Sequence, residues 1–418
     1  MMAHMEALDT LLHERFGHTA LRGIQGDVIG RVMAGASTLA IMPTGGGKSL
    51  TYQLPALALP GTAVVISPLI ALMQDQMRAA RAAGIRAATL TSADPDQRRT
   101  EAALRGGALD LIYVAPERAI RPDFAEALTG LAIPLFAVDE AHCVSHWGHD
   151  FRPDYRALMP LMQAHPDAAR LCLTATADAH TRADICAHFA IPPEGLLIGG
   201  FDRPNIHYAI QPRRRPVEQL SALIRGADGA SIIYCRTRRQ TEQLADELAR
   251  TGRRVLTYHA GLANEIRAAR AAAFLASEDM VMVATIAFGM GVDKPNVRLV
   301  AHLSPPDCVE AYYQETGRAG RDGAPARAVM LWAAEDLKRA RHRLHGMAQD
   351  RRPIEAQRLR AMTGLIRTWG CRRGVLLRYF GQEAPPACGN CDHCTQAPWR
   401  VRLVEGLRSV GRFLTSLR

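Results

Sequence analysis

Short apolar runs alternate with longer helix-like stretches from residue 38 onward. Runs of a few apolar residues bounded by polar ones are typical of buried strands, and their alternation with helical sequence predicts a parallel sheet. In the first series we expect strands at TLAIMP (38–43), TAVVIS (62–67), DLIYVA (110–115), PLFAVDE (134–140) and RLCLTATA (170–177).

A second series of the same kind follows a polar stretch at residues 201–205. From about Leu337 the apolar runs stop, and arginine-rich helical sequence leads into a cluster of cysteines. The pattern therefore predicts an α/β protein with two lobes in tandem, followed by a small helical domain. The expected strands of the second lobe are SIIYC (231–235), RVLTYH (254–259), MVMVAT (280–285), VRLVAHL (297–303) and ARAVMLW (326–332). The expected divisions are residues 1–202, 203–336, 337–400 and 401–418.

Composition narrows the class of protein. The chain is 48% hydrophobic over 418 residues, which suits several globular domains. Its start carries acids and histidines where a signal peptide would be apolar, and no uncharged apolar run reaches the roughly 18 residues that a membrane span needs. We therefore expect a cytoplasmic protein with no membrane segment.

The net charge of +10 is concentrated toward the C-terminal end. Residues 337–418 contain 17 Lys and Arg against 5 Asp and Glu. A basic region of this kind predicts contact with a polyanion such as nucleic acid. A solvated charged surface is an equally good interpretation of the charge alone.

A glycine-rich loop follows the first predicted strand and precedes a helical stretch. In this context backbone N–H groups and a helix N-terminus can hold phosphates, a lysine can reach the terminal phosphates, and a hydroxyl can ligate Mg²⁺. The chain has only three lysines, and one of them, Lys48, stands in this loop. A simple glycine turn is the alternative, since Met42 occupies the first glycine position of the strict phosphate-loop pattern. The expected ATP- and Mg²⁺-binding residues here are Thr44, Gly45, Gly46, Gly47, Lys48 and Ser49.

Two acids, Asp139 and Glu140, end the strand PLFAV and begin the sequence DEAH. In nucleotide hydrolases one carboxylate at a strand end holds Mg²⁺, while a neighbouring group orients and polarises the attacking water. A lone acidic strand end is usually just a turn. Together with the glycine-rich loop, however, this pair predicts ATP hydrolysis, with Asp139 as a Mg²⁺ ligand and with Lys48 and Glu140 as catalytic residues.

Four cysteines near the C-terminal end have the spacing C-x16-C-x2-C-x2-C. In a cytosolic chain such spacing favours a metal over disulfides. Four thiolates from Cys371, Cys388, Cys391 and Cys394 suit a closed, tetrahedral structural Zn²⁺ site. His393 is a competing ligand, and incidental free thiols are the alternative interpretation.

The pairing of MPTGGGKS (42–49) with DEAH (139–142) resembles the superfamily 2 helicases, and the cysteine spacing resembles the zinc domain of the RecQ family. The resemblance covers roughly residues 8–400. It implies two RecA-like lobes followed by a zinc-binding domain, with ATP, Mg²⁺ and Zn²⁺ as cofactors. It also implies 3′-to-5′ DNA helicase activity in repair and recombination. Single-stranded and forked DNA are the implied partners, and we expect the chain to act as a monomer.

Two further segments resemble RecQ motifs of the nucleotide site. FGHTALRGIQ (16–25) resembles the segment that reads adenine, which implies that Arg22 and Gln25 contact the base. In the second lobe, YYQETGRAGRDG resembles the arginine-finger motif. Planar guanidinium groups can neutralise charge on the γ-phosphate, and the resemblance implies this role for Arg321, with Arg318 as its neighbour.

The sequence directly after DEAH, CVSHWGHDFRPDY, is rich in aromatic and basic residues. Clustered aromatics usually pack in a core, but the glycine, aspartate and proline among them favour an exposed loop. Trp147 and Phe151 can stack on bases while Arg152 meets a phosphate or a carboxylate. The segment resembles the RecQ loop that couples DNA to hydrolysis. The matching LTAT segment implies that Thr174 and Thr176 pass the nucleotide state to the DNA-binding side.

Two other functions stay open from the residues alone, an RNA helicase and an ATP-switched nucleic-acid clamp that does not unwind. Only 24 residues follow Cys394, too few for a winged-helix domain. We therefore expect a short form without winged-helix and HRDC domains, which translocates on single-stranded DNA better than it separates duplex. Residues 401–418 are expected to form an amphipathic helix, either as a remnant of a winged-helix domain, as a helix packed on the zinc domain, or as a docking helix for a partner.

Overall fold

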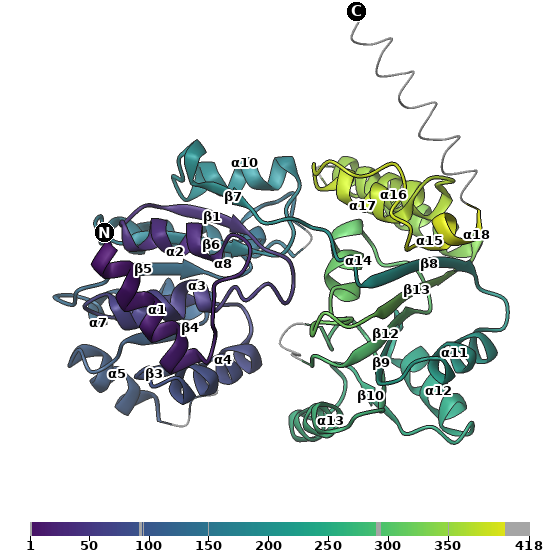
Figure 1. Cartoon of the computed structure of the whole chain (residues 1–418), viewed down its shortest axis with the longest axis horizontal. Helices are drawn as coiled ribbons and strands as arrows, with labels where there is room; N and C mark the ends of the chain where they lie inside the picture. Colours follow the sequence, from purple (N-terminus) through teal and green to yellow (C-terminus); the bar gives the residue numbers. More distant parts are fainter. Residues whose placement is uncertain are drawn as a thin grey trace, which may run out of the picture. The chain divides into compact units, whose positions relative to one another are not determined.

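The structure is a computed structural model, shown in Figure 1. It describes residues 2–91, 94, 96–148, 150–289, 294–349 and 351–397. The amphipathic helix expected at residues 401–418 lies outside the described residues. So do residues 290–293 of the second lobe and His149 of the segment CVSHWGHDFRPDY (143–155), here called the aromatic loop.

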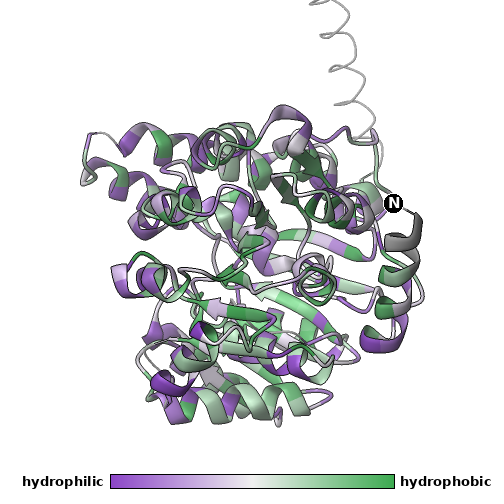
Figure 2. Cartoon of the chain, turned by 90° about the vertical axis from the view of Figure 1, so that its left-hand side faces the viewer, coloured by the Kyte–Doolittle hydropathy of each residue, from purple (hydrophilic) through white to green (hydrophobic). Residues whose placement is uncertain are grey.

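Apolar side chains concentrate in the strands. Figure 2 colours most strand segments toward the hydrophobic end of the scale, whereas purple gathers on helices and loops. Strands such as β1 (Thr38–Ile41) and β5 (Leu135–Val138) are buried at every position. A strand covered on both faces needs apolar residues without alternation, which is the pattern that the sequence has.

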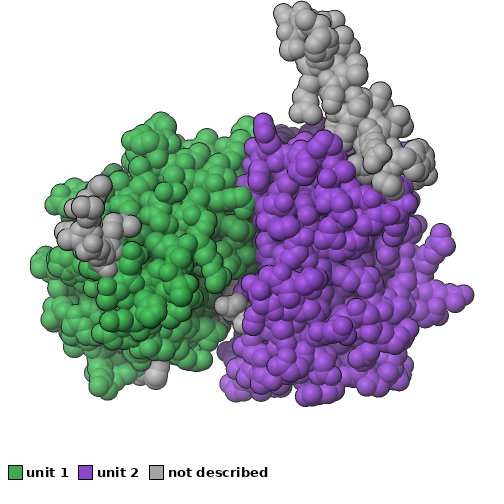
Figure 3. Space-filling view, viewed as in Figure 1, with its two compact units in different colours: residues 1–200 green, residues 201–418 purple. Residues whose placement is uncertain are grey.

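The chain divides into two compact units, coloured separately in Figure 3. Unit 1 comprises residues 1–200 and contains a seven-stranded sheet in the order β3-β4-β2-β5-β6-β1-β7. All of its strand pairs are parallel, so the carboxyl ends of the strands lie along one edge of the sheet. Its other strands are β2 (Ala63–Ile66), β3 (Ala87–Leu90), β4 (Leu111–Val114), β6 (Ala169–Thr174) and β7 (Leu196–Ile198).

Parallel neighbours need crossover connections, and helices supply most of them in unit 1. The start of α10 illustrates the local chemistry, because the Asp178 side chain accepts a hydrogen bond of 2.8 Å from the backbone N–H of Thr181. The helices of unit 1 are α1 (Met2–Phe16), α2 (Gln25–Met33), α3 (Leu50–Ala58), α4 (Ile70–Ala82), α5 (Gln97–Arg105), α6 (Pro116–Ala119), α7 (Pro122–Ala127), α8 (Pro153–Arg156), α9 (Met159–Gln163) and α10 (Ala179–His188), with short 3₁₀ turns η1 (Ala141–Val144) and η2 (Pro193–Gly195).

Unit 2 begins at Phe201 and contains a six-stranded parallel sheet in the order β10-β11-β9-β12-β13-β8. Its strands are β8 (Ile206–Pro212), β9 (Ala230–Tyr234), β10 (Val255–Tyr258), β11 (Val281–Ala284), β12 (Val297–His302) and β13 (Ala326–Trp332). Its helices are α11 (Pro216–Arg225), α12 (Arg238–Ala249), α13 (Asn264–Ala276), α14 (Val309–Thr316), α15 (Ala334–His345), α16 (Arg352–Arg367), α17 (Arg372–Tyr379) and α18 (Asp392–Gln396).

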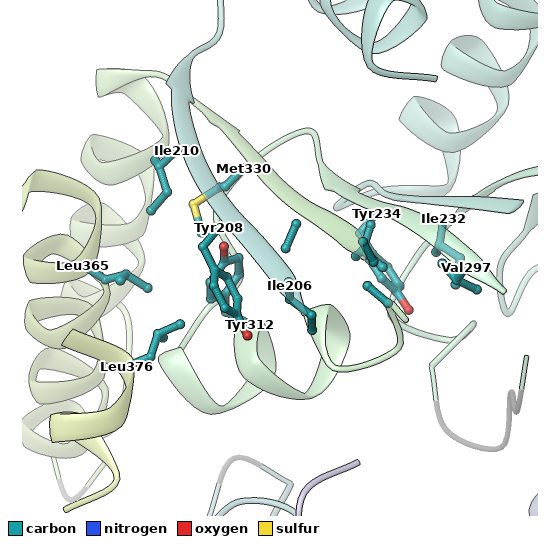
Figure 4. Packing of buried hydrophobic residues seen from close by; sticks show 14 of the residues in the cluster. Ile206, Tyr208, Ile210, Ile232, Tyr234, Val297, Tyr312, Met330, Leu365 and Leu376 are labelled. Atoms are coloured by element: carbon teal, nitrogen blue, oxygen red, sulfur yellow. The ribbon is translucent and has the colours of Figure 1, made fainter. Parts of the chain in front are cut away.

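The C-terminal helices of unit 2 share a core with its sheet. Figure 4 shows Tyr208 of β8 and Tyr312 of α14 lying near Leu365 of α16 and Leu376 of α17. All four side chains are buried in one continuous cluster. Helices α16 and α17, which flank Cys371, are therefore built onto the second sheet through this shared apolar core.

The predicted class of fold is confirmed: two parallel-sheet lobes precede a helical region with a cysteine cluster. Each strand expected from an apolar run is present. The sequence pattern missed β3, β7 and β8, and each of these strands lies at an edge of its sheet.

Candidate nucleotide and zinc sites

The glycine-rich loop lies between the end of β1 and the start of α3, where Ser49 is the N-cap residue. Gly45 and Gly47 have positive φ angles of 81° and 70°, a region that favours glycine. The Lys48 ammonium donates to the carbonyl oxygens of Met42 and Pro43 at 3.3 and 3.5 Å. The loop therefore turns tightly around an ammonium group at a helix N-terminus, as binding of a polyphosphate requires.

The segment expected to read adenine contacts this loop directly. The side-chain amide of Gln25 donates to the carbonyl oxygens of Gly46 and Gly47, both at 3.2 Å, and accepts from the backbone N–H of Arg22 at 2.7 Å. A pocket of about 200 Å³ opens beside them. It is lined by Phe16, His18, Ala20, Arg22, Gln25, Gly45, Gly46, Gly47, Ser49, Leu50 and Gln53.

The acidic pair follows β5, two strands away from β1 in the same sheet. Burial and the charge of Glu140 together raise the pKa of Asp139 to about 6, against the opposing effect of Lys48. Ser67 at the end of β2 donates to an Asp139 carboxylate oxygen at 3.5 Å. Glu140 is buried and has a positive φ of 48°, an uncommon conformation for a residue with a side chain. A buried and a half-buried carboxylate near a phosphate loop provide the oxygen ligands that Mg²⁺ prefers.

His142 connects the acidic pair to the end of β6. Its Nδ1 lies 3.3 Å from the Glu140 carboxylate and 3.0 Å from the Thr174 hydroxyl. Burial by itself lowers the pKa of His142, but Cys143 and Glu140 outweigh it and raise this pKa to about 10. The Thr174 hydroxyl also donates to the Thr176 carbonyl oxygen at 3.0 Å and accepts from the Thr176 N–H at 3.2 Å. Thus an ion pair and hydrogen bonds join Glu140 and His142 to both predicted threonines in one buried group.

The two arginines of the second lobe follow α14 in a loop at residues 317–323, here called the arginine loop. Arg318 is buried and Arg321 half-buried. Burial raises the pKa of Tyr234 to about 12, against the opposing effect of Arg318 beside it. The Arg318 side chain is therefore held within unit 2, next to the end of β9.

The structure gathers the four predicted cysteines. Their sulfur atoms all lie within 4.8 Å of one another, and Cys388 and Cys394 Sγ are 3.9 Å apart. A tetrahedral Zn²⁺ with zinc–sulfur bonds of about 2.3 Å places its ligands about 3.8 Å apart, so this cluster fits zinc. The backbone N–H groups of Gly374 and Asn390 donate to Cys371 and Cys388 Sγ, both at 3.3 Å.

His393, the competing ligand, is engaged elsewhere. Its Nδ1 lies 3.0 Å from the Gly370 carbonyl oxygen, and its Nε2 lies 3.0 Å from the Arg372 guanidinium. Both ring nitrogens therefore have protein partners. Among the described residues, the ligands that the site offers are the four cysteine sulfurs.

Comparison with known proteins identifies the family. The sequence matches the DEAD/DEAH box helicase family over residues 22–185, the helicase conserved C-terminal domain over 215–323, and the RecQ zinc-binding family over 334–395. The ATP-dependent DNA helicase RecQ of Pasteurella multocida is 44% identical over 94% of this chain and 62% of that protein. The probable ATP-dependent DNA helicase RecS of Bacillus subtilis is 33% identical over 93% of this chain and 92% of that protein. The chain belongs to the RecQ family of helicases.

Membership in the RecQ family confirms the resemblance and the expected cofactors, ATP, Mg²⁺ and Zn²⁺. The chain spans less than two thirds of the first RecQ relatives, 62% of the Pasteurella multocida protein and 64% of the Haemophilus influenzae protein. The structure of Mycobacterium smegmatis helicase Lhr bound to ssDNA and AMP-PNP has a TM-score of 0.62 over 87% of this chain and 58% of that chain. At 20% identity this likeness shows the fold alone.

The aromatic loop of this RecQ family member follows η1. Trp147 is 40% exposed, and its ring stacks on His180 with centroids 5.3 Å apart. Phe151 stacks on the ring of His146 at 3.9 Å. Arg152 pairs with the carboxylate of Asp150 at 3.0 Å and donates to the Pro68 carbonyl oxygen at 3.3 Å. The Trp147 ring is therefore partly accessible. Arg152 already has a carboxylate partner, and it connects the loop to the segment after β2.

Sequence reasoning missed several residues that hold these sites together. The DEAH motif by itself gives no role to His142, which contacts both Glu140 and Thr174 in the structure. Arg203 and Asn205, in a polar stretch that marked only the start of the second lobe, bind the arginine loop. Residues 201–205 form no helix or strand, so their sequence has no hydrophobic periodicity that could predict a role. The roles of Arg203 and Asn205 are visible only from their tertiary contacts.

Proposed function

We propose that this chain is an ATP-dependent DNA helicase and translocase, which moves 3′-to-5′ along single-stranded DNA and separates strands in DNA repair and recombination. The observation that carries the proposal is the buried group in which an ion pair and hydrogen bonds join Glu140 and His142 of DEAH to Thr174 and Thr176. Because the nucleotide site is bonded to the segment at the end of β6, a change from bound ATP to bound ADP can shift that segment. The names of the relatives, ATP-dependent DNA helicases, support the same activity.

In this proposal Lys48 binds the β- and γ-phosphates, while Ser49 and Asp139 hold Mg²⁺. The metal neutralises charge on the phosphates when it is bound. Glu140 accepts a hydrogen bond from the attacking water and takes its proton, and the paired His142 holds that carboxylate in place. Thr44 and the three glycines from Gly45 to Gly47 complete the phosphate cradle.

Arg22 and Gln25 contact the adenine base in this proposal, next to the loop that Gln25 already touches. Arg321 neutralises the charge that builds on the γ-phosphate during hydrolysis, with Arg318 as its neighbour. A positioned guanidinium of this kind contributes roughly 10³-fold or more to turnover.

The aromatic loop reports the presence of DNA to the acidic pair. Trp147 offers an exposed ring on which a base can stack, and Phe151 lies in the same loop. Arg152 fixes the loop to the segment after β2. The loop is also bonded to DEAH, since the Ser145 N–H donates to the His142 carbonyl oxygen at 3.1 Å.

The partners we propose are single-stranded and forked DNA, bound without base specificity through the phosphate backbone. We also propose that the chain acts as a monomer in the cytoplasm. None of the described helices combines the length and apolar character that a bilayer crossing requires.

An ATPase titration tests the proposal. Hydrolysis is measured with single-stranded DNA, forked DNA, blunt duplex and single-stranded RNA of the same length, for the chain and for its Glu140→Gln variant. We expect strong stimulation by single-stranded and forked DNA, little by blunt duplex or RNA, and none in the variant. Stimulation by RNA equal to that by DNA would identify an RNA helicase, and nucleotide binding without turnover would identify a clamp.

A further inference from the structure

Residues 201–205, Phe-Asp-Arg-Pro-Asn, open unit 2 and hold the arginine loop by its backbone. The Arg203 guanidinium donates to the carbonyl oxygens of Gly317 at 2.9 Å, Ala319 at 2.8 Å and Gly320 at 3.0 Å. The Asn205 amide donates to Gly320 O at 2.8 Å and to Ala324 O at 2.9 Å. Two side chains thus bind four carbonyl oxygens on either side of the two predicted catalytic arginines.

The geometry of the loop depends on these contacts. Gly320 has a positive φ of 56°, and any side chain there would collide with the Asn205 amide and the Ala324 carbonyl. Removal of the Arg203 guanidinium would leave three carbonyl groups of the loop without their charged hydrogen-bond donor. A planar guanidinium reaches several acceptors in a fixed arrangement, which a flexible ammonium cannot reproduce.

The zinc-binding region also binds residues 201–205. Arg373, two residues after the first cysteine ligand, is buried and donates to the carbonyl oxygens of Arg203, Pro204 and Ile206 at 3.1, 3.2 and 2.8 Å. It also pairs with the Asp202 carboxylate at 3.3 Å. The segment that binds the arginine loop is therefore itself bound, through its backbone, by the zinc-binding region.

Aromatic packing keeps this arrangement rigid. Phe201 stacks on Phe380 of the zinc-binding region with centroids 4.5 Å apart and planes 12° from parallel. The backbone N–H of Phe201 donates to the Gln382 side chain at 2.7 Å, and its carbonyl oxygen accepts from the Tyr313 hydroxyl of α14 at 2.8 Å. Ile206, directly after the segment, packs with helices α16 and α17 in the apolar core of Figure 4, so close packing holds the segment at both ends.

We propose that Arg203 is a positioning residue for ATP hydrolysis, and that Arg373 of the zinc-binding region fixes Arg203, so that this region sets the geometry of the arginine loop. The inference rests on the proposed function, in which Arg321 acts on the γ-phosphate. Loss of the Arg203 contacts lets the loop backbone shift, and a misplacement of about 1 Å can cost roughly 100-fold in rate. We expect substrate binding to change little, because the Arg203 guanidinium binds the backbone of the loop and not the residues proposed to hold ATP.

Arg203→Met tests the first step, with Arg213→Met as its matched control. Arg213 also lies next to β8 in unit 2 and binds a backbone carbonyl and the Asp336 carboxylate, but none of its recorded contacts is with the arginine loop. At saturating single-stranded DNA we expect Arg203→Met to lower kcat roughly 10- to 100-fold with KM for ATP changed less than about threefold. Arg213→Met should keep the parent kcat.

Hydrogen exchange and a conservative variant separate positioning from folding. We expect faster exchange at residues 317–323 in Arg203→Met and unchanged exchange in α16 and α17. Arg203→Lys should recover part of kcat, because its ammonium can reach one or two of the three carbonyl groups. If Arg203→Met does not fold, Arg203→Lys carries the test, and parent-like kcat together with parent-like exchange in that variant overturns the proposal.

A double variant tests the second step. If Arg373 acts through Arg203, Arg373→Met lowers kcat without loss of bound zinc, and Arg203→Met/Arg373→Met is no slower than Arg203→Met alone. Losses that multiply would overturn the connection. Arg321→Ala serves as the reference: if it hydrolyses ATP normally, the proposed role of the loop fails, whereas a slow Arg321→Ala with a fast Arg203→Met refutes only the positioning role.

Discussion

Replacing Thr174 by Val removes one hydroxyl group and keeps the shape of the side chain. That hydroxyl makes three contacts, with His142 Nδ1 at 3.0 Å, the Thr176 carbonyl oxygen at 3.0 Å and the Thr176 N–H at 3.2 Å. A buried polar group left without its partner costs about 1–3 kcal/mol. We therefore expect the free energy of unfolding to fall by about 1–3 kcal/mol. The loss should not be larger, because His142 keeps its contact with Glu140.

The larger effect should be on coupling, because the same hydroxyl joins DEAH to the segment after β6. ATP hydrolysis is measured with and without single-stranded DNA. We expect DNA-free hydrolysis near that of the parent, and stimulation by DNA reduced roughly 5- to 150-fold, the range of typical coupling energies. Thr62→Val is the control, since it removes a buried hydroxyl that donates at 2.7 Å to Leu109 O, at the amino end of β2. Parent-like stimulation in Thr174→Val, or an equal loss in Thr62→Val, would refute the reasoning.

Four further predictions concern the sites themselves. Lys48→Ala should abolish ATP binding and hydrolysis, whereas Glu140→Gln should bind a fluorescent ATP analogue normally and not hydrolyse ATP; turnover in both would contradict the assignment. Arg321→Ala should bind ATP with kcat lowered roughly 10³-fold, and normal turnover would remove its role. Trp147→Ala should keep DNA-free hydrolysis but lose stimulation by DNA, which equal titration curves would disprove. Cys391→Ser should lose bound zinc, measured by metal analysis, and unfold its region; a folded, metal-free variant would show that the cluster is dispensable.

The interior of both sheets could be predicted from the sequence, but three of their edges could not. Strands such as β1 and β5 are buried along their whole length, so their sequences are short continuous apolar runs. The edge strand β7 is partly exposed at every position, and Ile198 is 42% exposed. A strand with one neighbour needs less apolar surface, so its sequence resembles that of a loop.

The candidate sites divide in the same way. The residues of the phosphate loop are adjacent in the sequence, and the cysteines have a spacing that carries its own chemistry, so both were predictable. The contacts of His142 with Thr174, and of Arg203 with Gly317, join residues that are far apart in the sequence and not spaced by any period. Such pairs depend on which strands are neighbours, and strand order in a parallel sheet is a property of the whole fold.

Release of streptavidin from biotinylated single-stranded DNA tests directional, ATP-driven movement most directly. Oligonucleotides of one sequence carry biotin at the 5′ or the 3′ end, and release is followed for the chain and for Glu140→Gln. We predict ATP-dependent release from the 5′ end that is much faster than release from the 3′ end, and none by the variant. Faster release from the 3′ end, or no ATP-dependent release from either end, would contradict the account.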